Sequence, residues 1–327
     1  MSKVIKNFCH KPGYHCGSTA LANVAGYHGH NLSEAMCFGL GSGLGFFYYK
    51  DEIISPSRMF NGRTIFLEPM FFKNIGVAFQ WREGDSFPWD EMKSWIDRDV
   101  PVLILTDLYH LDYYDTNTHF TGHAVVLAGY DERERIALLA DTERKGLQQT
   151  SPDTLALAMN SRAQPYPLRN YWREIPCFDV PDLPSAIRTA LVENSRAMLN
   201  PSWDSAGLPA MELFSRDLAT WGDADDWQWC ARFTYQVIEK RGTGGSGFRR
   251  LYAAYLREAE NYLPALRKMS AGQRMGEIAR KWTQLAVQLY EISNNGPDLF
   301  HRAAETASEI TALEKSFFID ISKRCEQ

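Results

Sequence analysis

The sequence predicts an α+β domain over residues 1–178, followed by an all-α domain over residues 179–327. The first half contains three β-rich apolar runs, at residues 100–105, 123–130 and 136–140. After a linker marked by three prolines, every long segment instead has the apolar periodicity of a helix. With 327 residues, 45% of them hydrophobic, the chain is long enough for two cores.

Charge and composition exclude several functional classes. The net charge of -5 is spread evenly, because the first half carries 17 Lys and Arg against 20 Asp and Glu, and the second half 18 against 20. Neither half has the basic excess of a nucleic-acid-binding domain. No run resembles a signal peptide, and none approaches the roughly 18 apolar residues of a membrane span. We therefore expect a cytoplasmic protein that binds neither nucleic acid nor membrane.

The cysteines do not form a metal-binding or disulfide pattern. There are six, at positions 9, 16, 37, 177, 230 and 325. No pair has the C-x-x-C spacing, and none combines with histidines in a zinc-type arrangement. We expect free thiols in a reducing compartment and no metal site.

One cysteine stands where a glycine-containing loop becomes a helix. Cys16 follows the segment His10-Lys-Pro-Gly-Tyr-His15, and apolar positions recur at helical spacing from Ala20 to Tyr27. The unpaired N–H groups and positive dipole end of a first helical turn favour thiolate over thiol. Taken alone, such a cysteine is better explained as a core residue, so its interpretation depends on the rest of the chain.

Short elements connect this helix to the sheet. We expect helices at 32–40, 68–74 and 88–98, and strands at 46–49, 64–66 and 77–81. Glycines alternate at positions 39, 41, 43 and 45 just before the first of these strands. Two interpretations are open: a loop whose backbone approaches a substrate, with Gly43 at its centre, or a flexible connector. A phosphate-binding loop is not predicted, because the glycines precede a strand.

The second and third β-rich runs bring a histidine and an aspartate together. A charged turn at 131–135 joins them as a hairpin, with His123 at the start of one strand and Asp141 just after the other. A thiol nucleophile needs a base, and the base needs a third group to orient it. The order Cys16, His123, Asp141 is that of papain-like cysteine enzymes. We therefore predict a papain-like cysteine-peptidase fold, with an antiparallel sheet and an N-terminal nucleophile helix.

Acyl transfer also requires donors for an oxyanion. The backbone N–H of Cys16 is one donor by position. His10 is the candidate for the second donor, at a place where papain-like sites commonly have a glutamine, and His15 is its competitor. The rival nucleophile Cys9 has no helix start behind it.

The first half ends with a loop, a helix and a strand. The loop at 112–122 is rich in Tyr, Asp and Thr and is a candidate lid, from which His119 would line the cleft. A helix is expected at 152–162 and a last strand at 171–175.

The second half contains six helical segments, near 185–199, 209–220, 225–240, 248–266, 271–293 and 298–324. Within it, four glycines lie between Arg241 and the pair Arg249 and Arg250. Either this stretch is a helix C-cap followed by a loop, or loop amides and arginines form a site for a phosphate or carboxylate. The tryptophans of this half provide apolar surface for a homodimer.

Several motifs together resemble the butirosin biosynthesis protein H family. They are Tyr14-His-Cys-Gly-Ser-Thr-Ala-Leu21, Leu32-Ser-Glu-Ala, Phe38-Gly-Leu-Gly-Ser-Gly-Leu-Gly-Phe46, Gly122-His-Ala-Val-Val-Leu-Ala-Gly-Tyr-Asp131, Ala140-Asp-Thr142, Glu239-Lys-Arg-Gly-Thr-Gly-Gly245 and Phe248-Arg-Arg-Leu-Tyr252. Each motif is weak alone, but the combination is specific and covers nearly the whole chain.

The resemblance implies an acyltransferase of natural-product and antibiotic biosynthesis. Such an enzyme moves an acyl or aminoacyl group from the 4'-phosphopantetheine thioester of an acyl or peptidyl carrier protein to an amine of a small molecule, and binds no cofactor of its own. Cys16 would accept the acyl group, with His123 as base and Asp141 as its orienting group. The loop from Arg241 to Arg250 would hold the pantetheine phosphate or the carrier.

Two alternatives use the same scaffold. A cysteine peptidase or amidohydrolase would use the same three residues with water as the acceptor. A non-catalytic binding module on a papain-like scaffold is the third hypothesis.

Overall fold

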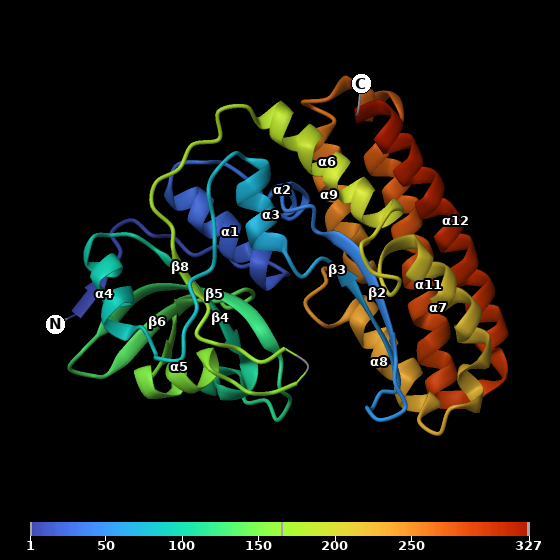
Figure 1. Ribbon diagram of the computed structural model, residues 1–327, viewed down its shortest axis with the longest axis horizontal. Helices are drawn as coiled ribbons and strands as arrows, with labels where there is room; N and C mark the ends of the chain where they lie inside the picture. Colours follow the sequence, from blue (N-terminus) through green and yellow to red (C-terminus); the bar gives the residue numbers. More distant parts are fainter. Residues whose placement is uncertain (1, 165, 326–327) are drawn as a thin grey trace. The chain divides into compact units, whose positions relative to one another are not determined.

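The computed structural model describes residues 2–164 and 166–325, which form two compact units. Unit 1 comprises Met1–Cys37 and Gly76–Pro181, and unit 2 comprises Phe38–Ile75 and Asp182–Gln327. Helices and an antiparallel sheet occur together (Figure 1), which confirms the α+β class.

Unit 1 is built on a six-stranded antiparallel sheet. The strands are β1 (Ser2–Val4), β4 (Val102–Asp107), β5 (Thr121–Asp131), β6 (Ile136–Ala140), β7 (Gln148–Thr150) and β8 (Trp172–Glu174). Their order is β7-β6-β5-β4-β8, with β1 also paired to β5. Strand β5 pairs with β6 from Val126 opposite Ala140 to Asp131 opposite Ile136, so the predicted hairpin is present.

The helices of unit 1 begin and end close to the predicted residues. They are α1 (Cys16–Tyr27), α2 (Glu34–Leu40, which continues into unit 2), α4 (Trp89–Asp97) and α5 (Pro152–Met159), with short 3-10 turns η1 (Leu108–His110) and η2 (Asp112–Tyr114). Apolar residues at every second position of β4 and β5, such as Ile104 and Val125, pack with Leu155 of α5 in one core.

Two predicted strands are wrong, and two short ones were missed. Residues 77–81 form no strand, and only Arg82 makes a bridge there, to Trp172. The strand expected at 64–66 lies instead at β3 (Arg58–Arg63). Strands β1 and β7 have three residues each, which is too short for a period-two pattern to be recognised.

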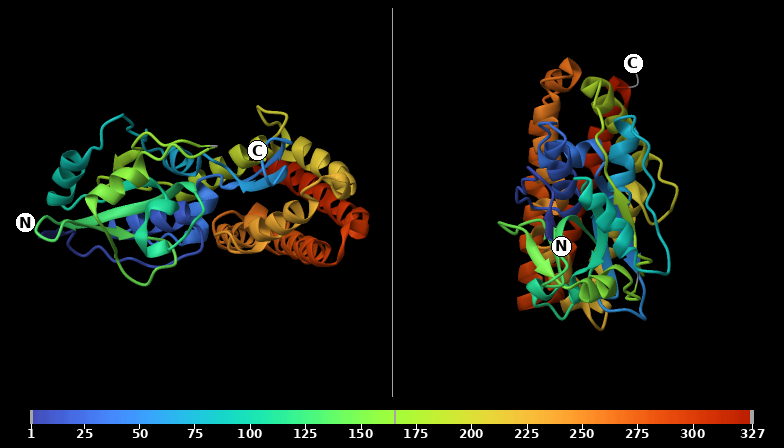
Figure 2. Two further views of the ribbon diagram at one scale, coloured as in Figure 1. Left: turned by 90° about the horizontal axis from the view of Figure 1, so that it is seen from below. Right: turned by 90° about the vertical axis from the view of Figure 1, so that its left-hand side faces the viewer.

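Unit 2 contains a β-hairpin in addition to its helices. The hairpin consists of β2 (Leu44–Lys50) and β3. The helices are α3 (Leu67–Asn74), α6 (Leu183–Leu199), α7 (Gly207–Asp217), α8 (Trp227–Glu239), α9 (Arg249–Ala259), α10 (Pro264–Lys268), α11 (Ala271–Asn295) and α12 (Phe300–Cys325), with 3-10 turns η3 (Leu218–Asp223), η4 (Ser246–Phe248) and η5 (Pro297–Leu299). Helix α11 packs against α8, α9 and α12 (Figures 1 and 2).

The division into units differs in one respect from the predicted domains, 1–178 and 179–327. The boundary at Pro181 lies in the predicted linker, but residues 38–75 belong with the helices. The reason is that the hairpin packs against these helices. The ring centroids of Phe46 and Phe60 lie within 6.0 Å of those of Phe214 and Trp282. All regular elements of residues 182–325 are helices, as predicted, but unit 2 as a whole is not all-α.

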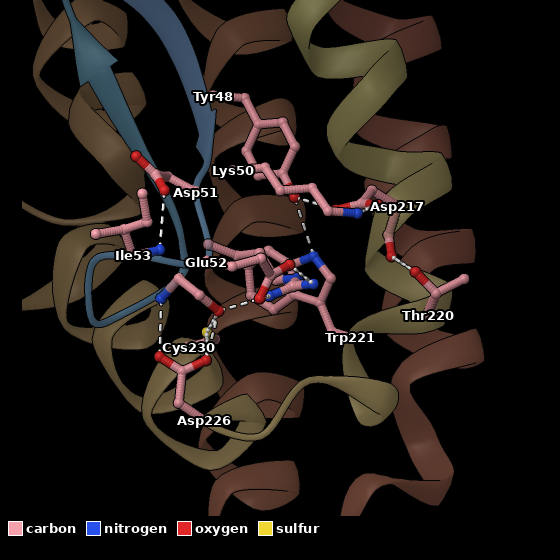
Figure 3. A network of polar contacts seen from close by, with 12 residues as sticks. Tyr48, Lys50, Asp51, Glu52, Ile53, Asp217, Thr220, Trp221, Asp226 and Cys230 are labelled. Carbon is pink, nitrogen blue, oxygen red and sulfur yellow. Dashed lines mark hydrogen bonds and ion pairs between the residues drawn. The ribbon is translucent and has the colours of Figure 1, made fainter.

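Polar contacts also join the hairpin to the helices of unit 2 (Figure 3). Tyr48 donates a hydrogen bond to Asp217, which also pairs with Lys50 at 2.8 Å. Further along the hairpin, Ser57 donates its N–H and its hydroxyl to Asp226, at 2.8 and 2.5 Å. These contacts explain why the segment 38–75 stays with residues far from it in the sequence.

The alternating glycines allow close packing within unit 2. A Cβ atom at Gly39 would lie 2.1 Å from the Tyr255 ring, and one at Gly43 would lie 2.6 Å from the carbonyl oxygen of Phe38. Gly43 is buried, and its own N–H and C=O are both hydrogen-bonded to backbone. The substrate-binding interpretation of Gly43 is therefore corrected: the glycines are required by steric contact inside unit 2, and they are not a flexible connector either.

Within residues 2–164 and 166–325, none of the helices has both the length and the apolar character needed to cross a bilayer.

Candidate active site

Cys16 is the first residue of α1 and is largely buried, with 8% of its surface exposed. The preceding residue, His15, has extended backbone and caps the helix, because its Nδ1 accepts the N–H of Ser18 at 3.3 Å. The thiol therefore lies in the first turn, where the helix dipole favours a negative charge.

A glutamate from the second helix fixes the loop before Cys16. The Glu34 carboxylate accepts the backbone N–H groups of Tyr14 and His15, at 3.0 and 2.8 Å for Oε1. It also accepts the hydroxyl groups of Ser18 and Thr19. The role of Glu34 was not predicted from the sequence, because the contact joins the starts of two helices and leaves no periodic signal.

Gly13 connects this loop to the strand end that carries Asp141. Its N–H donates to the carbonyl oxygen of Thr142 at 2.9 Å. A Cβ atom at position 13 would lie 2.2 Å from Thr19 Oγ1 and 2.7 Å from Glu34 Oε2, so only glycine fits between them. The loop before the thiol and the end of β6 are therefore held together directly.

The structure brings Cys16, His123 and Asp141 together. His123 Nε2 lies 2.7 Å from Asp141 Oδ1, and hydrogen bonding and charge from the imidazole lower the pKa of the Cys16 thiol. His123 is 4% exposed and Asp141 is fully buried. Because Nε2 contacts the carboxylate, Nδ1 is the ring nitrogen available to the thiol. The arrangement is the one expected of a nucleophile, a base and an orienting group, and their catalytic roles stay a prediction.

Three hydroxyl groups complete the environment of Asp141. Tyr113 donates to Oδ2 at 2.7 Å, while Tyr114 and Thr142 donate to Oδ1 at 3.1 and 3.0 Å. Tyr114 Oη also lies 3.4 Å from His123 Nε2. The two tyrosines come from η2, in the loop that the sequence predicted as a lid. The loop is rich in Tyr, Asp and Thr, but no sequence signal indicates that these two tyrosines bind the aspartate.

These contacts favour an ion pair between Cys16 and His123. Burial raises the pKa of the Cys16 thiol, but the electrostatic interaction with His15 and the hydrogen bond and charge of His123 outweigh it and hold the pKa well below its ordinary value. Burial lowers the pKa of His123, but the charge and hydrogen bond of Asp141, with those of Cys16, raise it to about 10. The arrangement thus favours thiolate and imidazolium at neutral pH.

Asp141 remains ionised in this environment. Burial raises the pKa of its carboxyl group, but the charge of His123 and the hydrogen bonds from His123 and its hydroxyl neighbours hold the pKa below the ordinary value. The pKa of Tyr113 is raised by burial and by the charge of Asp141, so its hydroxyl remains a donor.

His10 is not available as an oxyanion donor. Its Nδ1 faces the amide nitrogen of Asn23 at 3.1 Å, which is a donor, and its Nε2 faces the carbonyl oxygen of Arg144 at 2.7 Å, which is an acceptor. Nδ1 must therefore accept, and the ring's N–H is used by Arg144. The structure thus contradicts the proposed role of His10, which instead fixes the loop before Cys16 to the chain after Asp141.

His119 is held by a different carboxylate. Its Nδ1 lies 2.7 Å from Asp107 Oδ2, and its ring stacks on Tyr109 with centroids 4.1 Å apart. Among the described residues, Asp107, His110 and His119 place potential metal-ligand atoms within 4.8 Å of one another. However, Asp107 already accepts from Ser161 and from the N–H groups of two loop residues. We interpret the cluster as fixing this loop, and a role of His119 in a cleft stays a prediction.

The three arginines predicted to bind a phosphate or carrier lie in different environments. Arg249 is fully buried in an ion pair with Glu314, at 2.8 Å between Nε and Oε1, and its Nη1 donates to the carbonyl oxygens of Gly62 and Gly247. Each of its three guanidinium nitrogens donates to an acceptor inside unit 2, so its assignment to carrier binding is corrected. Arg241 and Arg250 are exposed, and their role stays a prediction.

Two known families match successive parts of the chain, and the division between them lies between residues 142 and 153, before the unit boundary at Pro181. Residues 15–142 match the family described as Butirosin biosynthesis protein H, N-terminal. Residues 153–321, more than half of the chain, match Domain of unknown function (DUF4872). No curated protein matches the chain. The N-terminal match includes Cys16, His123 and Asp141, and the resemblance expected from the motifs is confirmed. The chain belongs to the DUF4872 family, and its residues 15–142 form a domain of the family described as Butirosin biosynthesis protein H, N-terminal.

Proposed function

We propose that this protein is a biosynthetic acyltransferase with a papain-like catalytic unit. It moves an acyl or aminoacyl group from a carrier-protein thioester to a small-molecule amine. The observation that supports this most strongly is the chain of contacts from the Cys16 thiol through His123 to Asp141. The family description, which names butirosin biosynthesis, supports a role in a biosynthetic pathway over the cleavage of a peptide.

In the first step, the Cys16 thiolate attacks the carbonyl carbon of the donor thioester. A bond forms between Sγ and this carbon, and the carbonyl oxygen becomes an oxyanion near the N–H groups at the start of α1. The bond to the pantetheine sulfur then breaks, and this sulfur takes the proton of the His123 imidazolium. One thioester is exchanged for another, and His123 is left neutral.

Acylation itself prepares His123 for the second step. The charge and hydrogen bond of Cys16 contribute to the raised pKa of His123. The acyl-enzyme lacks both, so the pKa of His123 falls and the imidazole becomes a general base. It takes a proton from the attacking amine, the C–S bond breaks as the amide forms, and the thiolate–imidazolium pair is restored.

In this proposal the protein binds no cofactor of its own, and the phosphopantetheine arrives on the carrier protein as part of the substrate. The exposed Arg241 and Arg250 are candidate contacts for the acidic carrier. Because the whole chain has a net charge of -5, attraction to such a carrier depends on local basic residues.

Intact-mass spectrometry tests the proposal directly. We expect wild-type protein mixed with an acyl carrier protein thioester to gain the mass of one acyl group, mapped to Cys16 and absent in Cys16→Ala. The adduct should persist in buffer and disappear when an aminoglycoside amine is added, with formation of the amide.

Two results would contradict the proposal. Rapid conversion of the adduct to free acid, unaffected by amine, identifies a hydrolase that uses the same residues. If no thioester acylates Cys16, the protein has no acyl-transfer activity at this thiol. Protein with the exposed Cys9 and Cys177 replaced by serine is the matched background, because it removes adventitious acyl acceptors.

A further inference from the structure

An arginine beside Asp141 has no carboxylate partner among the described residues. Arg144 follows the end of β6, and its backbone N–H donates to the carbonyl oxygen of Asp141 at 2.9 Å. Its side chain is half-buried, and its Nε lies buried without a hydrogen-bond partner. Across residues 2–164 and 166–325, none of the ion pairs includes its guanidinium group.

The guanidinium lies on the tyrosine pair that binds Asp141. Its central carbon is 4.6 Å from the centroid of the Tyr114 ring and 5.8 Å from that of Tyr113. The Tyr114 hydroxyl in turn contacts both His123 and Asp141. Tyr114 thus contacts the guanidinium through its ring and the candidate base His123 through its hydroxyl. The cation–π contact holds the planar guanidinium in place.

The fold itself does not require this charge. The contact between Arg144 and His10 uses the backbone carbonyl oxygen, which any residue supplies. A buried guanidinium N–H without an acceptor is unfavourable by about 1–3 kcal/mol. Arginine presents its donors as a planar fork that matches a carboxylate or a phosphate. An anionic partner would therefore satisfy the geometry, the charge and the unused donor together.

We infer that Arg144 binds a negatively charged group of the thioester donor, either a carboxylate on the acyl chain or the phosphate of the pantetheine arm. The inference rests on the proposed function, because it takes the donor to be a thioester that reaches Cys16. In this inference, Arg144 makes the enzyme prefer an anionic thioester donor over a neutral one.

Paired thioesters distinguish the two anionic groups. Succinyl and butyryl thioesters of N-acetylcysteamine differ in one carboxylate and carry no phosphate. Acetyl 4'-phosphopantetheine and acetyl pantetheine differ only in the phosphate. For each pair, the rate of Cys16 acylation by the anionic thioester is divided by that of the neutral one.

In Arg144→Met, which keeps an apolar stem on the tyrosine rings, we expect one of these ratios to fall about tenfold or more. Arg144→Lys keeps the positive charge but lacks the planar pair of donors, so it should restore part of the lost rate ratio. A structural disturbance would slow both members of a pair equally and leave the ratio unchanged. The matched control is Arg133→Met, an exposed arginine at the opposite end of the β5–β6 hairpin.

A binding measurement keeps the inference separate from the acyl-transfer proposal. Cys16→Ala protein is titrated calorimetrically with the succinyl thioester and with 4'-phosphopantetheine, with and without Arg144→Met. We expect Arg144→Met to weaken the binding of one of them about tenfold or more. The inference is overturned if Arg144→Met and the wild type give the same rate ratio for both pairs of thioesters. It is also overturned if neither ligand binds, or if both bind equally well with and without Arg144→Met. Arg144-dependent binding without acylation of the wild type would instead overturn the proposed function.

Discussion

Replacing Asp141 with asparagine will slow the acylation of Cys16 on the order of 10²- to 10³-fold. The carboxylate raises the pKa of His123 and accepts its Nε2–H. Asparagine removes the charge, so the pKa of His123 falls and the thiolate loses its imidazolium partner. The amide also has only one acceptor oxygen, whereas the tyrosine pair donates to both oxygens of the carboxylate.

The rate is measured by rapid-quench mass spectrometry with a carrier thioester. Asp153→Asn is the matched control, because it removes the same charge from an exposed ion pair with Arg135 in the same unit. Tyr113→Phe should cost much less, since it removes a single hydrogen bond from Asp141. An Asp141→Asn enzyme that is acylated within about threefold of the wild-type rate would show that His123 acts without this carboxylate.

Replacing Arg249 with methionine is expected to destabilise unit 2 by about 3–5 kcal/mol. The substitution leaves the fully buried carboxylate of Glu314 without its cation, with the indole N–H of Trp282 at 2.7 Å as its remaining donor. It also removes the donor that satisfies the carbonyl oxygen of Gly62 in the hairpin. An unpaired buried charge is far more costly than a missing surface contact.

Urea unfolding of the full chain, followed by tryptophan fluorescence, measures this effect. The neighbouring Arg250→Met is the matched control, since Arg250 is exposed, and it should change the free energy of unfolding by less than about 0.5 kcal/mol. The double variant Arg249→Met, Glu314→Leu should recover most of the stability, because it leaves no unpaired charge. Equal stability of the two single arginine variants would show that the buried pair does not stabilise unit 2.

The sequence predicted the helices and the central hairpin because their signals are local. Periodicity located α1 and β6, and the hairpin register followed from the charged turn, so His123 and Asp141 were expected at one end of the sheet. Strong periodic patterns over several residues determine an element almost independently of its neighbours. The α+β class was predicted on the same basis.

Contacts between distant segments were not predictable in this way. The alternating glycines have the same sequence pattern whether a substrate or a Tyr255 ring lies against them. Likewise, Arg249 and Arg250 are adjacent in the sequence, but only the packing of unit 2 makes one a buried ion pair and leaves the other exposed. Glu34 acts on the loop before Cys16 through backbone N–H groups, for which no residue type is diagnostic.

We expect Cys16 to be a thiolate paired with the imidazolium of His123. The pH dependence of its alkylation by iodoacetamide, in protein with Cys9 and Cys177 replaced by serine, tests this most directly. An ordinary thiol, with a pKa of about 8.5, is only a few per cent ionised at pH 7, so its rate rises about tenfold per pH unit between pH 6 and 8. Because the pKa of Cys16 is lowered, we expect its rate to be already at a plateau at pH 7 and to decrease only in acid. A tenfold rise per unit through neutral pH would contradict the thiolate–imidazolium pair.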